Sequence, residues 1–218
     1  MAVGKYRFCS VCFIGVFVLS ALTGCRGRNI DLASGPAPGL LDSVPIREGD
    51  IIFRQGIGIE ATLVNNIDSA SLFSHVGIFV DTLGGKYVVH ILPRDNGDNE
   101  KGGIRLQSVA DFLRTDRARA YAVIRIGGDG CGARKAADYA KSCLRADIPF
   151  DCTFNTEDST MMYCSELVWR AYLQGGIDIS EGRRHCIPAM AYPVIFPSDL
   201  FFCARRVLLF QRFTGVSE

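Results

Sequence analysis

The stretch YCSELVWRAY, from Tyr163 to Tyr172, has the pattern of an amphipathic helix that begins with a cysteine. A helix N-terminus stabilises negative charge, so a thiol there loses its proton more easily and becomes a nucleophile. Cysteine is also a small apolar residue that is often buried. Taken alone, the stretch fits a catalytic and a structural Cys164 equally. The apolar residues recur at helical spacing and form one stripe that would face a core: Leu167, Val168, Ala171 and Tyr172.

A cysteine hydrolase needs an imidazole that takes the thiol proton and a third group that orients the imidazole. The chain has three histidines: His75, His90 and His185. His185 stands in the charged stretch EGRRHC, where a solvated side chain is expected. His75 begins a strand-like apolar run and, by itself, is typical of a buried histidine bonded to a backbone carbonyl.

The spacing of His75 and His90 indicates a shared site. The β-rich runs that carry them flank Leu83-Gly84-Gly85, a hairpin signal. An even-numbered loop would place both on one face of the hairpin, and an odd-numbered loop on opposite faces. A loop from Asp81 to Gly84 would set them directly opposite, with Cβ atoms ~4.5–5.5 Å apart, whereas a turn centred on Gly84-Gly85 would offset them. Such a pair orients one ring or binds a metal; no third ligand stands at a telling spacing, so no metal is expected.

Two neighbours of Cys164 offer alternative chemistry: a serine nucleophile at Ser165, or an acid at Glu166. Cys164 is favoured because its sulfur is intrinsically more nucleophilic. Glu166 in the first turn complements the helix dipole. Its charge opposes a thiolate, so a useful Cys164 requires His75 close by as an imidazolium.

The N-terminus has the order of a secretory signal. Lys5 and Arg7 precede a short apolar run, which ends at the small-residue site LTGC. LTGC resembles a bacterial lipobox, which implies cleavage before Cys25 and lipid on its sulfur; an ordinary signal peptide with a coincidental cysteine is the alternative. In a Gram-negative lipoprotein, Arg26 in place of Asp would fit an outer-membrane destination. A Gly- and Pro-rich segment follows and has the composition of a tether. We therefore expect a signal peptide at 1–24, a tether at 25–45 and a folded domain at 46–218.

Composition narrows the function further. The 218 residues carry a formal net charge of +1, with no basic run interleaved with aromatics, so nucleic acid is not an expected partner. Six of the nine cysteines follow the lipobox and show no C-x-x-C pair. A free Cys164 leaves five, an odd number, which argues against a complete disulfide framework. Most of the five are expected in the core.

Patterning within the domain predicts an α+β fold. A hairpin lies in the middle of the chain, and Ser108 is placed to cap a short helix. We expect strands at 49–55, 73–81, 86–92, 103–107, 119–126 and 205–213, and helices at 56–68, 109–115, 132–144 and from Cys164.

Three motifs, GDIIFRQG, FSHVGI and YCSELVWRAY, occur in this order and resemble the circularly permuted papain-fold hydrolases of the NlpC type, in particular the YiiX-like group. PSDLFF, at 197–202, fits as well. In unpermuted relatives the cysteine helix precedes the histidine strand, and here the order is reversed. The resemblance implies a permuted papain-like fold, with an antiparallel central sheet or half-barrel and flanking helices.

The resemblance also implies site roles. Cys164 matches the nucleophile, His75 the base and His90 the third, polar position. A glutamate is expected at that third position in YiiX-like relatives, and a histidine is nearer the lecithin:retinol acyltransferase branch. The residues expected to line or support the site are Tyr163, Asp50 and Ser74.

These inferences predict a cofactor-free cysteine hydrolase, anchored by lipid in the bacterial cell envelope, that cleaves amide or ester bonds of cell-wall peptides by a Cys-His-His thiolate mechanism. Two alternatives stay open. One is a hydrolase or acyltransferase acting on lipid acyl esters. The other is a non-catalytic binding lipoprotein of the same fold.

The lipobox generates the first testable prediction. Intact mass spectrometry of the membrane fraction should show a chain that starts at Cys25 and carries acyl groups, since several fatty chains hold a protein to a bilayer. Cys25→Ala should release the protein from membranes without unfolding its domain. A soluble product cleaved elsewhere would contradict the assignment.

Overall fold

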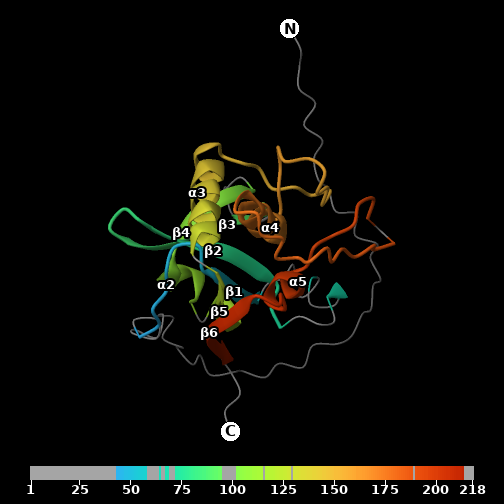
Figure 1. Ribbon diagram of the computed structural model, residues 1–218. Helices are drawn as coiled ribbons and strands as arrows, with labels where there is room; N and C mark the ends of the chain where they lie inside the picture. Colours follow the sequence, from blue (N-terminus) through green and yellow to red (C-terminus); the bar gives the residue numbers. More distant parts are fainter. Residues whose placement is uncertain are drawn as a thin grey trace, which may run out of the picture. The chain divides into compact units, whose positions relative to one another are not determined.

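The computed structural model describes residues 43–57, 64, 67, 68, 72–94, 102–114, 116–128, 130–188 and 190–213. Five strands come before the long helices, and a sixth closes the chain (Figure 1). The strands are β1 (Ile51–Gly56), β2 (His75–Thr82), β3 (Gly85–Leu92), β4 (Gly103–Ser108), β5 (Ala118–Ile126) and β6 (Arg206–Phe213). The helices are α2 (Val109–Phe112), α3 (Cys131–Arg145), α4 (Cys164–Gln174) and α5 (Pro197–Phe201).

The strands form one antiparallel sheet in the order β4-β3-β2-β1-β5-β6. The β2–β3 hairpin turns through Leu83 and Gly84, which both have positive φ, and Thr82 pairs with Gly85. Positive φ at both central residues is the geometry of a type I′ turn. The predicted hairpin is therefore present, with an even-numbered loop.

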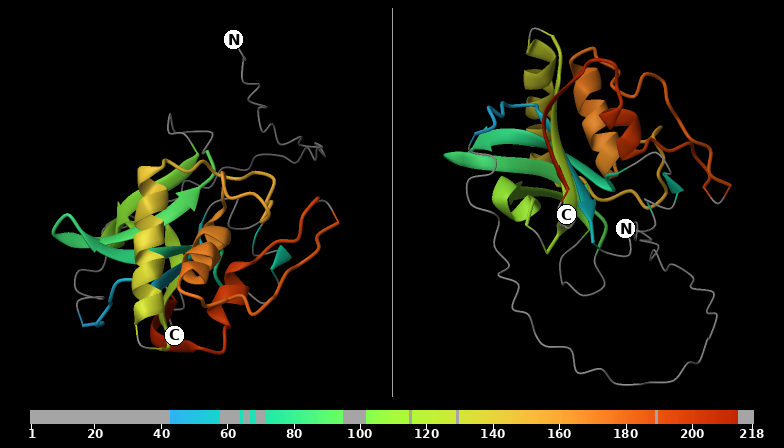
Figure 2. Two further views of the ribbon diagram at one scale, coloured as in Figure 1. Left: turned by 45° about the horizontal axis from the view of Figure 1, so that its top comes forward. Right: turned by 90° about the horizontal axis from the view of Figure 1, so that it is seen from below.

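Helices cover both faces of the sheet (Figure 2). On one face, α3, α4 and α5 pack against alternate residues of the strands, such as Val76 and Ile78 of β2, in the larger core cluster. On the other face, α2 packs its Phe112 against Phe79 and Val88. Ser108 caps α2, as predicted, by accepting a hydrogen bond from Asp111 N at 3.1 Å.

Small residues let α3 and α4 pack closely. A Cβ on Gly175, the C-cap of α4, would lie 2.7 Å from the Cα of Gly132 in the first turn of α3. The buried stripe of α4 is the one that its spacing predicts: Leu167, Val168, Ala171 and Tyr172.

The predicted α+β class is confirmed, and the strands and helices fall at the predicted places within a few residues. The exception is α5, which begins at Pro197 and was not predicted as a helix. Most of the predicted helix at 56–68, the signal peptide and most of the tether lie outside the described residues, and Gly56, the expected start of that helix, ends β1. No helix in the described part of the chain is long and apolar enough to cross a membrane.

The two predictions about the cysteines have different outcomes. Cys143, Cys164, Cys186 and Cys203 are free, so the cysteines after the lipobox do not form the complete disulfide framework that the odd count argues against. The expectation that most of the five besides Cys164 lie in the core is wrong, because only Cys143 and Cys203 are buried. The exposed ones are Cys131, Cys152 and Cys186.

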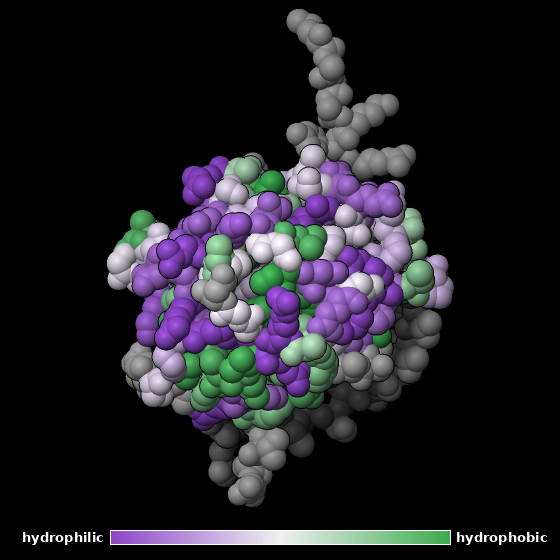
Figure 3. Space-filling view, viewed as in Figure 1, coloured by the Kyte–Doolittle hydropathy of each residue, from purple (hydrophilic) through white to green (hydrophobic). Residues whose placement is uncertain are grey.

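Strand β6 is an edge of the sheet and exposes apolar side chains. Val207, Leu208 and Phe213 are each about half exposed. Figure 3 shows an apolar patch where Figure 1 places β6.

The turn before β1 is fixed by contacts to both α3 and α4. Gly49 has a φ of +86°, and a Cβ there would lie 2.2 Å from the carbonyl oxygen of Ala133. The carbonyl of Gly49 accepts a hydrogen bond from Tyr172 Oη at 2.5 Å. Next to it, Asp50 accepts two hydrogen bonds from Arg125, at 2.8 and 2.7 Å. Asp50 thus has a structural role at the end of β1 away from His75.

Two glycines with positive φ separate backbone strain from steric overlap. Gly84, at +72°, has open space around its Cβ position, whereas Gly49 has Ala133 there. Gly84→Ala should cost about 1 kcal/mol of unfolding free energy, the price of a left-handed residue. Gly49→Ala adds overpacking and should cost about 3 kcal/mol. Urea unfolding at constant m-value measures both, and equal losses would show that the Ala133 contact is unimportant.

Candidate active site

Strand register brings the two predicted histidines together. Because Ile78 pairs with Val89, the register places His90 directly opposite Gly77. His75 lies two residues before Gly77 on β2, so the two histidines are diagonal neighbours on the same face of the sheet. The predicted shared face is thus observed, with a diagonal in place of a direct pairing. A Cβ on Gly77 would lie 2.5 Å from a methyl carbon of Val88 and 3.0 Å from the Cβ of His90. Glycine at this position leaves room for the His90 ring.

The two rings are hydrogen bonded. His75 Nε2 lies 2.9 Å from His90 Nδ1, and the rings meet nearly edge to face. Both are buried, with exposed fractions of 7% and 1%. Phe112 of α2 covers them, with ring centroids 5.7 Å from His75 and 5.0 Å from His90. The face of the sheet that carries α2 therefore holds the histidine pair.

Cys164 lies beside Val76, the residue after His75, where β2 and β3 separate. Phe79 N donates to the carbonyl oxygen of Asp50, the residue before β1, so alternation along β2 directs the N–H of Val76 toward β3. The β2–β3 pairing ends at Ile78, and the thiol of Cys164 accepts a hydrogen bond from the Val76 N–H. Cys164 is half-buried at the start of α4, which packs on β2. The sulfur thus contacts the residue directly after His75.

Protonation differs from the predicted thiolate–imidazolium pair. Burial raises the pKa of the Cys164 thiol, and hydrogen bonds from Ser165 and from the Val76 N–H offset this only in part. Burial, followed by the charge of Arg54, lowers the pKa of His75 and of His90 well below 6.5. The described residues hold no direct hydrogen bond between the thiol and the His75 ring. This environment thus disfavours the charged forms of both the thiol and the imidazole.

The three residues predicted to line or support the site have different contacts. Tyr163 is buried, and its Oη accepts a hydrogen bond from Ile195 N at 2.9 Å, which ties the start of α4 to the segment before α5. Ser74 Oγ accepts from Gly56 N at 2.9 Å and fixes the entry into β2. Asp50 does not line the site, as its bonds to Arg125 show.

The alternative groups beside Cys164 are both buried. Ser165 Oγ lies 3.9 Å from the sulfur of Cys164. Glu166 pairs with Arg170 at 2.7 Å, and burial raises its pKa to about 7 despite this pairing. The contact with Arg170, one helical turn along, supports the structural role for Glu166.

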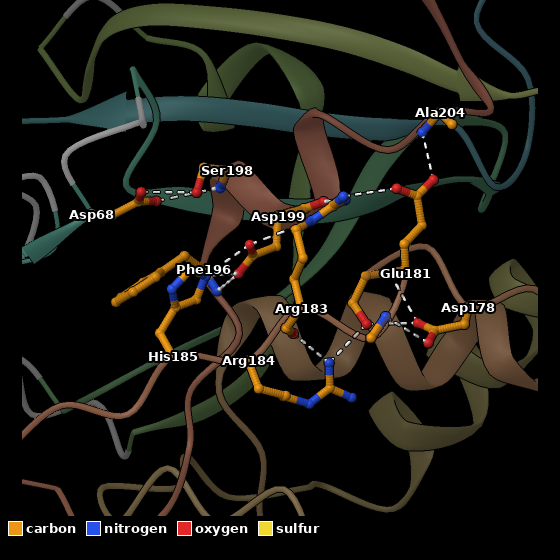
Figure 4. Close-up of polar contacts among 12 residues, drawn as sticks. Asp68, Asp178, Glu181, Arg183, Arg184, His185, Phe196, Ser198, Asp199 and Ala204 are labelled. Atoms are coloured by element: carbon orange, nitrogen blue, oxygen red, sulfur yellow. Dashed lines mark hydrogen bonds and ion pairs between the residues drawn. The ribbon is translucent and has the colours of Figure 1, made fainter.

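His185 belongs to a second polar cluster (Figure 4). Its Nε2 lies 2.9 and 3.0 Å from the two carboxylate oxygens of Asp199 on α5, so the expected solvated side chain is only half exposed and has a partner. Asp199 also accepts from Phe196 N at 2.7 Å, which caps α5, and the guanidinium of Arg183 lies against it. On the same helix, Ser198 donates to Asp68 at 2.8 Å.

A cavity of about 300 Å³ opens at this cluster. Phe196, which lines it, packs with Tyr163 in one apolar cluster, so the cavity and the cysteine helix share a wall. Its lining combines charged and apolar side chains: Ile67, Asp68, Arg183, His185, Phe196, Ser198, Asp199 and Phe202.

Sequence reasoning missed two residues of the site. Arg54 stands in the motif GDIIFRQG, on the strand that pairs with the His75 strand. Phe112 follows the predicted cap at Ser108. Neither sequence pattern shows that these two side chains lie near the histidines. In the described part of the chain, no group of three or more His, Cys, Asp and Glu side chains is placed to hold a metal ion.

Comparisons with known proteins agree with this geometry. A family model described as a permuted papain-like amidase enzyme, YaeF/YiiX, C92 family, matches residues 45–192. The crystal structure of metalloprotein YiiX from Escherichia coli O157:H7 superposes with a TM-score of 0.62 at 19% identity, covering 77% of this chain and 98% of that one. At that identity the likeness shows the fold alone. No curated protein matches the chain.

The buried histidines predict acid sensitivity. The folded chain keeps His75 and His90 uncharged below pH 6.5, where the unfolded chain binds protons. Their contribution to stability is therefore full above that pH and is lost as the pH falls, at about 1.4 kcal/mol per unit for each histidine. His90→Asn should flatten this slope by one proton in urea titrations between about pH 7 and 5. An unchanged slope would mean that His90 is charged in the folded chain.

Proposed function

Because the chain belongs to the permuted papain-like amidase family YaeF/YiiX, C92, we propose that it is a cell-envelope cysteine hydrolase that cleaves amide bonds, with Cys164 as nucleophile and His75 as base. One observation carries the assignment. The thiol of Cys164, at the start of α4, accepts a hydrogen bond from the N–H of Val76, the residue after His75, and the ring of His75 is hydrogen bonded to His90.

The reaction starts from the neutral pair. When His75 Nε2 donates to His90 Nδ1, the Nδ1 of His75 keeps a lone pair for the thiol proton. As the sulfur attacks the carbonyl carbon, that proton moves to His75 and the carbonyl oxygen becomes an oxyanion. N–H groups at the start of α4 lack partners within the helix and can hold the oxyanion. His90 steers the ring of His75 but accepts no substrate proton.

Collapse of the tetrahedral intermediate breaks the carbon–nitrogen bond. The imidazolium of His75 protonates the leaving amine, and a thioester remains on Cys164. His75, neutral again, then takes a proton from water, and the hydroxide attacks the thioester. The acid product leaves, and the thiol regains its proton.

The proposed location limits the substrate. A lipoprotein anchored through Cys25 meets peptidoglycan, whose peptides offer amide bonds. The mixed charged and apolar lining of the cavity at Asp199 suits a peptide with charged ends. We therefore place cell-wall peptides first among the substrates.

Lipid acyl esters are the second candidate. The apolar cluster at Tyr163, immediately before the nucleophile, includes the partly buried Phe150, Phe154, Ile187 and Met190, which suit an acyl chain. Turnover of purified cell-wall peptides, compared with phospholipid vesicles, decides between the two. Absence of turnover on both would favour a binding lipoprotein.

Kinetics test the assigned roles. Cys164→Ala should abolish turnover, and His75→Ala should lower kcat by ~10²–10⁴-fold, the usual loss of a general base. The double variant should lose little more, because the pair acts as a unit. His90→Ala should be milder, and His90→Glu should keep much of the activity. Cys131→Ala, an exposed cysteine on α3, is the matched control. A dead His90→Ala beside an active His75→Ala would reverse the roles.

A further inference from the structure

Arg54 is a charged side chain in the interior of the sheet. It lies on β1 and is 8% exposed. Its Nη1 donates to the carbonyl oxygen of Phe112 at 3.0 Å, and its guanidinium carbon lies 4.4 Å from the centre of the Phe112 ring. Its buried Nε has no hydrogen-bond partner in the described part of the chain. Two contacts to one residue of α2 therefore fix the cation in place.

The same anchor residue holds the histidines. Arg54 pairs with His75 in the β1–β2 register, so both side chains stand on the α2 face of the sheet. The Phe112 ring contacts Arg54, His75 and His90. Among the described residues no carboxylate forms an ion pair with Arg54. The cluster consequently has a fixed positive charge and no fixed negative one.

This charge acts on both members of the proposed pair. After burial, Arg54 is the largest cause of the lowered pKa of His75 and of His90. A negative charge on Cys164, in turn, raises the pKa of Arg54, which burial and Arg117 lower to about 10. A fixed cation therefore disfavours a proton on His75 and favours an anion on Cys164.

We propose that Arg54 is a positioning residue of the site: a buried, permanent cation that keeps His75 in its uncharged, proton-accepting form and serves as counter-charge for the anion that forms on Cys164. The proposal rests on the proposed function and deepens it. The usual partner of such a histidine is a carboxylate, which favours the charged ring. Here the third position is a neutral His90, and the fixed charge has the opposite sign.

Other charged groups face this cluster and enter any pH dependence. Arg105 of β4 pairs with His90 in register and adds to the lowering of its pKa. Arg117, before β5, acts in the same direction on His90 and on Arg54. From α4, the titratable group that acts on this cluster is the thiol of Cys164. A test must therefore change Arg54 alone and leave the other cations in place.

Two variants isolate the charge. Arg54→Met keeps an unbranched side chain without charge, and Arg54→Lys keeps the charge. The titration of His75, followed by NMR of its ring protons, should move up by about one pH unit in Arg54→Met and stay near the wild-type value in Arg54→Lys. The rate of Cys164 alkylation by iodoacetamide at neutral pH, read on its peptide by mass spectrometry, should fall about tenfold in Arg54→Met only. Arg134→Gln, which removes an exposed charge on α3, is the control and should change neither readout.

The outcomes are decisive for Arg54. Equal His75 titrations in the Met and Lys variants, with melting curves like the wild type, would overturn the proposal and leave Arg54 a structural residue. If Arg54→Met does not fold, Cys164→Ala supplies the second test. A thiolate–imidazolium pair would lose its anion there and the pKa of His75 would drop, which overturns the proposal, whereas the neutral pair predicts little change.

The readouts also separate this proposal from the proposed function. Neither titration nor alkylation needs a substrate. A wild type that turns over no amide or ester refutes the hydrolase, yet the response of His75 and Cys164 to Arg54 still decides the role of the cation.

Discussion

The separation of β2 from β3 just before Ile78 is the constraint on which the site depends. If the ladder continued, Val76 N–H would be bonded to β3 and the sulfur of Cys164 would face a closed sheet. Because it stops, the first residue of a helix packed on one face contacts Val76, next to a histidine that stands on the other face. The I′ turn at Leu83-Gly84 sets the register, and Gly77 leaves the space that His90 needs. Local backbone features thus place all three candidate residues.

The site departs from the common picture of a cysteine hydrolase in its charge. Burial favours neutral forms of Cys164 and His75, and the buried cation lies on the side of the base. In the proposed mechanism, charge separation therefore occurs during attack, in the presence of the substrate carbonyl. A thiol that stays protonated before the substrate binds is less reactive. Protonation also protects Cys164 from oxidants, which attack thiolates preferentially.

Much of the fold was predictable because short-range signals carry it. Alternation and turn residues located the strands, and the stripe of α4 located its buried face. The even loop put His75 and His90 on one face. The register itself was not predictable, since it depends on whether Leu83 tolerates positive φ. Contacts through Phe112 and the Asp199–His185 bond join segments far apart in the sequence, and no local pattern reports them. Helix position alone favours a thiolate at Cys164, but it leaves out burial, which raises the pKa of the thiol.

The order of the motifs bears on how the protein is made. Arg54, His75 and His90 leave the ribosome early, within neighbouring antiparallel strands, whereas α4 comes late and makes long-range contacts with β2. Long-range contacts form slowly and close only when most of the chain is present. Under the proposed export route, the emerging chain therefore carries the proposed base before the proposed nucleophile. In this proposal, hydrolytic competence arises only after translocation, once the whole chain has folded.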